Sequence, residues 1–376
     1  VGLLDYKASP LGEQLPGVEL HAQLIEQIFD QSYLVRPAWA LWLELAFLAA
    51  GAALLIVLVP AAQLRISLAA LAVLLAVSVL GGLFAFRQGV LIDAAWPVVG
   101  ITAAFALLLA AALSEADRQR RELRVAAARS AGELEAARRI QMGLLPDTRQ
   151  FDGERRFAVR ALVQPARVVG GDFYDCFKLD EDRLFFVVAD VSDKGMAAAV
   201  FMALCKATIK AAVISSGAEP AEALRRAAKE IGRDNPEAFF VTVFAGSLQL
   251  DTGTLRYCNA GHEPPYLRGA QGLVRLPAAS RPPVGVPDEI AFTSESLQLA
   301  PGEWLCALTD GVTEAMDEHG ELYGAQRLEQ VLRPLPADSK PAQVTAAVLE
   351  DVSRFVGNAA ASDDLTLLAL RWTNGR

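Results

Sequence analysis

The 376-residue chain has few of the residues that build disulfide scaffolds and zinc sites. It contains four cysteines and three histidines. They are Cys176, Cys205, Cys258 and Cys306, and His21, His262 and His319. Because the cysteines stand far apart, the sequence excludes a zinc ribbon and a disulfide framework and suits a reducing compartment. Three histidines also leave little room for a histidine-rich metal cage.

Charged residues are scarce as well. Asp, Glu, Lys and Arg make up 21% of the chain and hydrophobic residues 53%, with a mean hydropathy of +0.30. Membrane segments are the first expectation for such a composition. The formal net charge of −9 argues against nucleic-acid binding, because proteins that bind nucleic acids offer positive charge to the phosphates.

The scarcity of charge is greatest between residues 38 and 113. This stretch holds only four charged residues, namely Glu44, Arg65, Arg87 and Asp93. Its apolar runs, 38–59, 66–86 and 94–113, are each near the roughly 20 residues that a helix needs to cross a bilayer. Core helices of a soluble domain are the alternative, but such helices rarely stay apolar on every face. We therefore expect three transmembrane helices, with Glu44 at an interface or facing a neighbouring helix.

Basic residues beside the spans predict their orientation. Four arginines follow the third span, namely Arg118, Arg120, Arg121 and Arg124. Positive charge that flanks a span stays on the cytoplasmic side. Arg65 agrees with this orientation, whereas Arg36 and Arg87 oppose it. We expect residues 1–37 outside the membrane and everything after residue 114 inside the cell.

The segment before the first span combines a turn rich in proline and glycine with an amphipathic helix. No positively charged stretch precedes an apolar run near Val1, so we expect no signal peptide and a chain that begins inside a longer protein. The segment SPLGEQLPGVELHA, followed by RPAW and the three spans, resembles the C-terminal end of a CHASE-type extracytoplasmic sensor of the second class. The resemblance implies that residues 1–37 are the remnant of such a sensor.

Residues 114–145 follow the spans and predict a linker helix. Steps of four and three residues give a heptad seam of Leu123, Ala127, Ser130, Leu134, Ala137, Gln141 and Leu144. The alanines, Ser130 and Gln141 make this seam a weak one. We expect a coiled coil that joins two chains into a homodimer, with a single solvated helix as the alternative. Pro146 ends the helix.

The remaining residues, 147–376, predict an α/β domain. Its strand-like runs are RFAVRALV, RLFFVVADV, FFVTVFAGSLQL, TLRYCNA, EWLCALTD and DLTLLALRW. Its helix-like runs are MAAAVFMALCKATIKAAVI, PAEALRRAAKEIG and PAQVTAAVLEDVSRFVG. The turn at Asp251, Thr252 and Gly253 indicates a hairpin between two of the strands. Strands that follow strands, with helices in pairs, indicate layers built on antiparallel sheet.

Aspartates recur at the ends of these strands. They are Asp172 in VVGGDFYD, Asp190 in FFVVADVSDKG, Asp310 in LCALTDGV, and Asp363 and Asp364 in ASDDLTLL. A buried carboxylate without a partner is very unfavourable, and Lys194 is the only lysine near any of them in the sequence. Each aspartate alone could be a turn residue. Together they predict a cluster of hard oxygen ligands around Mg²⁺ or Mn²⁺.

Five motifs, in this order, carry a family resemblance: GGDFYD, ADVSDKGMAAAVFMA, NAGHEPP, TDGVTEA and SDDLTLL. The region from Ala136 to Trp372 resembles the SpoIIE/RsbU branch of the metal-dependent PPM protein phosphatases. The resemblance implies an α-β-β-α sandwich of two antiparallel sheets, with two divalent ions, Mn²⁺ or Mg²⁺, at one edge. It also implies hydrolysis of phosphoserine or phosphothreonine on a protein, by a metal-activated water and without a covalent nucleophile.

The resemblance assigns the ligands residue by residue. Asp172, Asp190, Asp310 and Asp363 match the metal aspartates of the family, which are the residues that carry its catalysis. Asp190 is expected to bridge both ions, and the backbone carbonyl of Val191 is expected to complete the shell.

Four further residues have two interpretations each. Asp364 either supports the ligands structurally or is itself a ligand. Arg167, five residues before Asp172, either contacts the substrate phosphate or is a solvated strand residue. His262 either protonates the leaving oxygen or makes a structural hydrogen bond within NAGHEPP. Asp193 is a helix cap or a ligand.

Two other functions compete with a phosphatase. The GGDF of residues 170–173 is similar to the GGDEF signature of diguanylate cyclases, but a cyclase would not explain Asp310 or Asp363. A signalling receptor whose catalytically silent domain only binds a partner would have lost a metal aspartate, and none is lost. By resemblance, the substrate is a phosphorylated regulatory protein of the anti-sigma, partner-switching kind. The protein would then be a multi-pass protein of the bacterial inner membrane with a cytoplasmic catalytic domain.

Overall fold

The computed structural model describes residues 6–8, 14–30, 33–233, 235–278, 281–286 and 291–375. The chain divides into two compact units, Val1–Ala128 and Arg129–Arg376. One helix, α4 (Ala95–Leu144), contributes residues to both units. The expected third span and the expected linker are therefore parts of a single helix.

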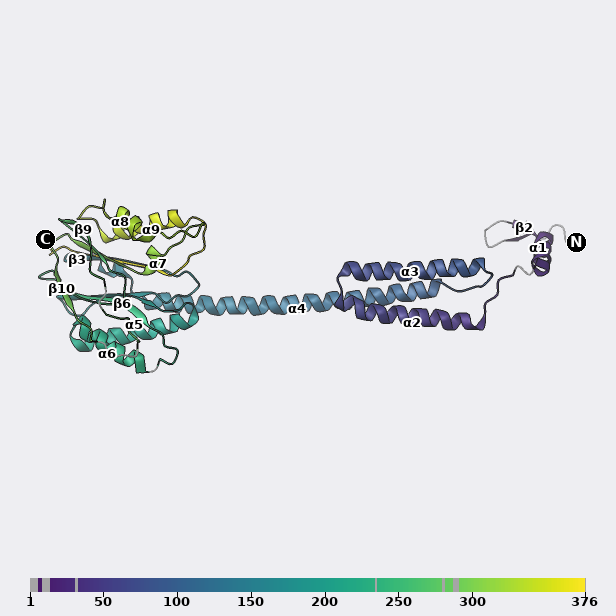
Figure 1. Ribbon diagram of the computed structural model, residues 1–376, viewed down its shortest axis with the longest axis horizontal. Coiled ribbons are helices and arrows are strands. Elements are labelled where there is room, and N and C mark those ends of the chain that lie inside the picture. The colour runs from purple at the N-terminus through teal and green to yellow at the C-terminus, as the bar shows by residue number, and fades with distance from the viewer. Residues whose placement is uncertain are drawn as a thin grey trace. The chain divides into compact units, whose positions relative to one another are not determined.

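The first unit is built on three long apolar helices that lie side by side (Figure 1). They are α2 (Ala38–Ala61), α3 (Leu64–Arg87) and the first part of α4. All three are long and apolar enough to cross a membrane, as the sequence predicts. Leu55 and Val59 of α2 pack against Ile101 and Phe105 of α4. The elements before them are β1 (Tyr6–Ala8), β2 (Gln14–Pro16) and α1 (Gly17–Asp30).

Glu44 of α2 is buried within this unit. Its carboxylate accepts hydrogen bonds from the Trp96 indole at 3.0 Å, the Arg36 guanidinium at 3.1 Å and the backbone N–H of Asp93 at 2.7 Å. A buried charge is tolerated when it is paired and hydrogen-bonded. Glu44 therefore faces its neighbours as expected, and it pairs with Arg36, one of the two arginines that oppose the predicted orientation.

The second unit is a sandwich of two antiparallel sheets with helices on both outer faces (Figure 1). The first five-stranded sheet has the order β10-β7-β6-β5-β4, and the second has the order β3-β12-β11-β8-β9. The first sheet contains β4 (Phe173–Lys178), β5 (Arg183–Val191), β6 (Val241–Gln249), β7 (Thr254–Ala260) and β10 (Glu295–Gln298). The second contains β3 (Phe157–Gln164), β8 (Tyr266–Gly269), β9 (Gly272–Arg275), β11 (Trp304–Leu308) and β12 (Leu365–Trp372).

The helices cover the two sheets in separate groups. The first sheet is covered by α5 (Met196–Ser216) and α6 (Pro220–Arg233). The second is covered by α7 (Asp310–Thr313), α8 (Gly324–Leu332) and α9 (Pro341–Val356). The short helix η1 (Thr148–Phe151) precedes β3. These layers confirm the α-β-β-α sandwich.

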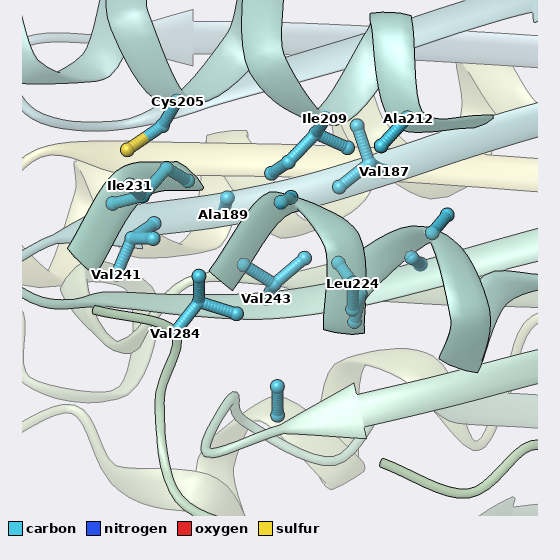
Figure 2. Packing of buried hydrophobic residues seen from close by; sticks show 14 of the residues in the cluster. Val187, Ala189, Cys205, Ile209, Ala212, Leu224, Ile231, Val241, Val243 and Val284 are labelled. Carbon is cyan, nitrogen blue, oxygen red and sulfur yellow. The ribbon is translucent and has the colours of Figure 1, made fainter. Parts of the chain in front are cut away.

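The central strands are apolar at nearly every position because both faces of each sheet are covered. In β5, Val187 and Ala189 face the helices α5 and α6, whereas Phe186 and Val188 face the second sheet. Figure 2 shows the first of these cores, with side chains of the helices meeting those of the strands, among them Ile209, Leu224, Val187 and Val243. Successive side chains of a strand thus point alternately to the helices and to the other sheet, up to the end of the strand.

The strands and helices named from the sequence are all present, and the hairpin between β6 and β7 forms around Gly253. The sequence interpretation missed the short elements β1, β2, η1, β4, β8, β9, β10, α7 and α8. Helix α5 is also long and apolar enough to cross a membrane, but Met202, Cys205 and Ile209 of this helix pack in the core of the sandwich. Its apolar character is therefore explained by burial in the domain.

Candidate metal centre

The pairing of β4 with β5 brings two of the predicted aspartates together. Phe173 lies opposite Ala189 in the antiparallel register, so Asp172, just before β4, stands beside Asp190 near the end of β5. A β-carbon on Gly171 would lie 2.9 Å from the backbone oxygen of Val191. Glycine at 171 thus allows the chain before Asp172 to approach the Val191 carbonyl.

The pairing of β11 with β12 brings the other two aspartates to the same edge. Leu308 lies opposite Leu367, which places Asp310, after β11, beside Asp363, before β12. A β-carbon on Gly311 would collide with the backbone oxygen of Asp364. The TDG motif needs its glycine for this close approach of the two segments.

Thr309 joins the two pairs across the sandwich. Its hydroxyl donates a hydrogen bond of 2.7 Å to Oδ2 of Asp172 and accepts one of 2.9 Å from the backbone N–H of Thr366. Thr309 and Thr366 belong to the second sheet region, whereas Asp172 precedes β4 of the first sheet. The four predicted aspartates therefore gather at one edge of the paired sheets.

The carboxyl groups at this edge raise one another's pKa values. Burial raises the pKa of Asp172 well above its usual range, and the charge of Asp190 raises it further. Burial raises the pKa of Asp190 to about 7, and the charge of Asp310 is the next cause. Burial also raises the pKa of Asp310 to about 6, with a contribution from the charge of Glu314. Bringing in positive charge would stabilise the ionised forms.

The donor set fits a hard divalent cation. Carboxylate and backbone carbonyl oxygens are the ligands that Mg²⁺ and Mn²⁺ prefer, and the one ion pair described among the four aspartates is that of Asp363 with Lys194. Among the described residues, no three His, Cys, Asp or Glu side chains already converge closely enough to hold one ion. Mg²⁺ commonly keeps several waters and takes only one or two carboxylates as ligands, so the absence of a ready three-residue cluster in the described part of the chain is compatible with such an ion.

Asp364 holds the backbone that leads to Asp172. Its Oδ1 accepts a hydrogen bond from the N–H of Ala166, and its Oδ2 accepts one from the N–H of Gly171, both at 2.7 Å. Both oxygens are thus engaged by backbone donors, which supports the structural interpretation of Asp364. The carboxylate fixes the loop 165–171 against the start of β12.

His262 is buried beneath the site. Its Nδ1 lies 2.8 Å from the hydroxyl of Thr242, and Thr242 is the register partner of Asp190. Burial lowers the pKa of His262 to about 3, so the ring is neutral near pH 7. A neutral ring has no proton to give as an imidazolium, which favours the structural hydrogen bond over the role of general acid.

Arg167 and Asp193 lie on the loops around the aspartates. The Arg167 side chain is exposed, and its Nη1 would be 3.9 Å from a β-carbon on Gly195. Asp193 is exposed in the left-handed region at φ 74°, and its carboxylate accepts a hydrogen bond from the N–H of Lys194. Among the described residues, neither side chain makes a hydrogen bond or ion pair with the four aspartates.

The sequence interpretation missed three contacts. Two of them lie at the site itself: the hydrogen bond from Thr309 to Asp172 and the Lys194–Asp363 ion pair of 2.8 Å. All of these residues belong to the five family motifs. A third is the buried pair of Lys206 and Asp175, 2.6 Å apart between α5 and β4. The second aspartate of GGDFYD was the available signal for that pair, since a buried carboxylate needs a partner.

Two family models match separate parts of the chain. The model of the Stage II sporulation protein E (SpoIIE) family matches residues 180–373. The model of the CHASE2 domain matches residues 1–60. The second match reaches past the 1–37 remnant expected from the sequence and into α2.

Comparison with single proteins gives three similar relatives. The protein IcfG of Synechocystis is 31% identical over 266 residues, covering 63% of this chain and 41% of IcfG. The phosphoserine phosphatase RsbU of Bacillus subtilis is 27% identical over 252 residues, covering 64% of this chain and 70% of RsbU. The solved SiaA-PP2C domain of Pseudomonas aeruginosa has a TM-score of 0.58 and 25% identity, covering 66% of this chain and 98% of that domain. The chain thus spans less than half the length of IcfG.

Proposed function

Because the chain belongs to the SpoIIE family, we propose that it is a metal-dependent protein phosphatase that hydrolyses phosphoserine or phosphothreonine on a regulatory protein. The observation that carries the proposal is the gathering of four strand-end aspartates at one edge of the two sheets. Clustered acidic groups that raise one another's pKa values are typical of a catalytic or metal site. The similarity to RsbU, which is named a phosphoserine phosphatase, supports the reaction.

The proposed ligands are those expected from the motifs. Asp172, Asp190, Asp310 and Asp363 would hold two divalent ions, Mn²⁺ or Mg²⁺, with Asp190 shared by both and the Val191 carbonyl completing the shell. When bound, such ions lower the pKa of a coordinated water and neutralise charge on the phosphoryl oxygens.

The chain's own residues would keep this acidic set in place. Thr309 orients the Asp172 carboxylate by donating to its Oδ2. Asp364 fixes the loop before Asp172 through two backbone N–H groups. His262 supports Thr242 opposite Asp190. Pre-organised ligands of this kind avoid rearrangement during the reaction.

A cysteine nucleophile is not part of the proposal. All four cysteines are buried, and burial raises the pKa of each thiol. Because the thiolate is the reactive form, these side chains are unsuited to covalent phosphate chemistry.

The substrate and the cellular setting are further parts of the proposal. The substrate would be a phosphorylated antagonist of the anti-sigma, partner-switching kind, as the family resemblance implies. The three spans would anchor the protein in the bacterial inner membrane, with the phosphatase domain in the cytoplasm and the CHASE2-like segment outside. The linker 114–145 would join two chains into a dimer, and an extracytoplasmic signal would set the phosphatase rate.

The reaction can be tested directly on the purified chain in detergent. With Mn²⁺ it should release phosphate from a phosphoserine protein or from p-nitrophenyl phosphate, and EDTA should abolish this release. Restored turnover on adding Mn²⁺ back would separate metal removal from unfolding. Turnover that persists in EDTA would contradict the proposal.

A further inference from the structure

Gln141, near the end of α4, is buried in the phosphatase unit. Its Nε2 donates a hydrogen bond of 2.5 Å to the backbone oxygen of Gly170, and its Oε1 accepts one of 3.2 Å from the Gly170 N–H. The side chain is only 6% exposed. One amide therefore satisfies both backbone groups of one glycine.

Gly170 lies two residues before Asp172, in the loop that Asp364 also holds. Asp364 accepts the N–H groups of Ala166 and Gly171, while Gln141 takes both groups of Gly170. The loop is thus fixed on one side by the residue next to Asp363 and on the other by the linker helix. Both contacts hold the segment that leads directly into Asp172.

The heptad pattern predicts Gln141 as a weak seam position that faces a partner helix. The structure places it against its own phosphatase domain instead. Leu134 and Ala137, two turns and one turn earlier on the same face, are half-buried, and Leu145 packs against the cores on both faces of the first sheet. The last turns of α4 therefore belong to the folded phosphatase unit.

The chemistry at position 141 is specific. A carboxamide offers both a donor and an acceptor, and the two groups of Gly170 need one of each. An apolar side chain of the same size would leave a buried N–H and C=O unpaired, which destabilises this arrangement of the loop. The geometry favours a residue selected for this contact over one that merely weakens a coiled coil.

We propose that Gln141 is a positioning residue for the metal centre: by fixing Gly170, the last turns of α4 set where Asp172 stands. The inference rests on the proposed function, since it concerns the affinity of the same site for metal. A rotation or shift of the end of α4 would displace the loop 165–171 and weaken metal binding. The linker helix would then act on the site through this contact.

The test compares Gln141→Leu with the unmodified full chain in detergent, by calorimetric titration with Mn²⁺ and by hydrogen exchange of the backbone amides. Loss of a residue that orients a metal ligand commonly weakens metal affinity 10- to 100-fold. We expect Mn²⁺ binding at least about tenfold weaker and faster exchange confined to residues 165–172. Ile140→Leu is the matched control, because Ile140 is 69% exposed, and it should change neither measurement.

A second variant covers the case in which Gln141→Leu does not fold. Gln141→Glu keeps an acceptor for the Gly170 N–H and loses the donor, so its effect on both measurements should be intermediate. The inference would be overturned if folded Gln141→Leu showed unchanged Mn²⁺ affinity and unchanged hydrogen exchange. If only Gln141→Glu folds, the same result in that variant would overturn it. Absence of Mn²⁺ binding in the unmodified chain would contradict the proposed function instead, while the exchange of residues 165–172 would still report on the contact.

Discussion

The ammonium of Lys194 lies 2.8 Å from Oδ2 of Asp363 and donates a second hydrogen bond of 2.8 Å to the backbone oxygen of Ser362. Burial lowers the pKa of Lys194, but the hydrogen bond to Asp363 and nearby acidic charges outweigh this and raise the pKa overall. The lysine is thus charged and ties the loop after β5 to the loop before β12. It also occupies an oxygen that is proposed as a metal ligand.

Replacing Lys194 should therefore strengthen metal binding. In water, two like unit charges 4 Å apart repel by about 1 kcal/mol, which is about 2 kcal/mol for a divalent ion, so Lys194→Gln should tighten Mn²⁺ binding by about 10- to 100-fold. Calorimetric titration of the metal-free chain measures this. Lys229→Gln, at an exposed lysine of α6, should have no effect, and weaker binding in Lys194→Gln would show that the lysine supports the site.

The linker helix has two proposed functions, pairing with a second chain and contact with Gly170. Ser130→Leu strengthens the predicted seam without touching the Gly170 contact, and we expect it to change the dephosphorylation rate in membranes at saturating Mn²⁺. Ala131→Leu lies off the seam and should not. One residue inserted after Ala131 rotates the downstream helix by about 100° and should change the rate as well. Equal rates in all of these variants would make 114–133 a passive tether.

The orientation of the three spans can be tested with reporter fusions. Positive charge after the third span predicts that a reporter fused after Arg124 is cytoplasmic. A reporter fused before Arg36, or after Gln88, should be periplasmic. The reverse pattern would show that the number of spans or their orientation is wrong.

Much of the sandwich could be predicted because its central strands are buried on both faces. A run such as RLFFVVADV in β5 has no polar alternation and matches the structure to the residue. The missed strand β10 (Glu295–Gln298) is four residues long and mostly exposed, so it carries neither an apolar run nor a clear period. Short edge strands of this kind are defined by pairing with β7, which the local sequence does not encode.

The placement of Asp190 and Asp310 at strand ends was predictable, because in each case a motif joins an apolar strand to an aspartate. Contacts between distant segments were not. Gln141 and Gly170 are 29 residues apart, and the periodicity that placed Gln141 on a seam cannot tell a partner helix from the chain's own domain. The contact of Glu44 with neighbouring residues could be predicted, because a carboxylate inside an apolar span needs a partner in any fold.

The most direct test of the metal-centred account is the rate of Asp190→Asn. This change removes the charge proposed to be shared by both ions. We therefore expect kcat for Mn²⁺-dependent release of phosphate from a phosphoserine protein to fall by more than about 100-fold, because loss of a residue that only hydrogen-bonds to a metal ligand already costs about 10- to 100-fold. Asp193→Asn, three residues away and in a left-handed conformation that asparagine tolerates, should retain nearly full turnover. Full activity of Asp190→Asn in the folded chain would contradict the account.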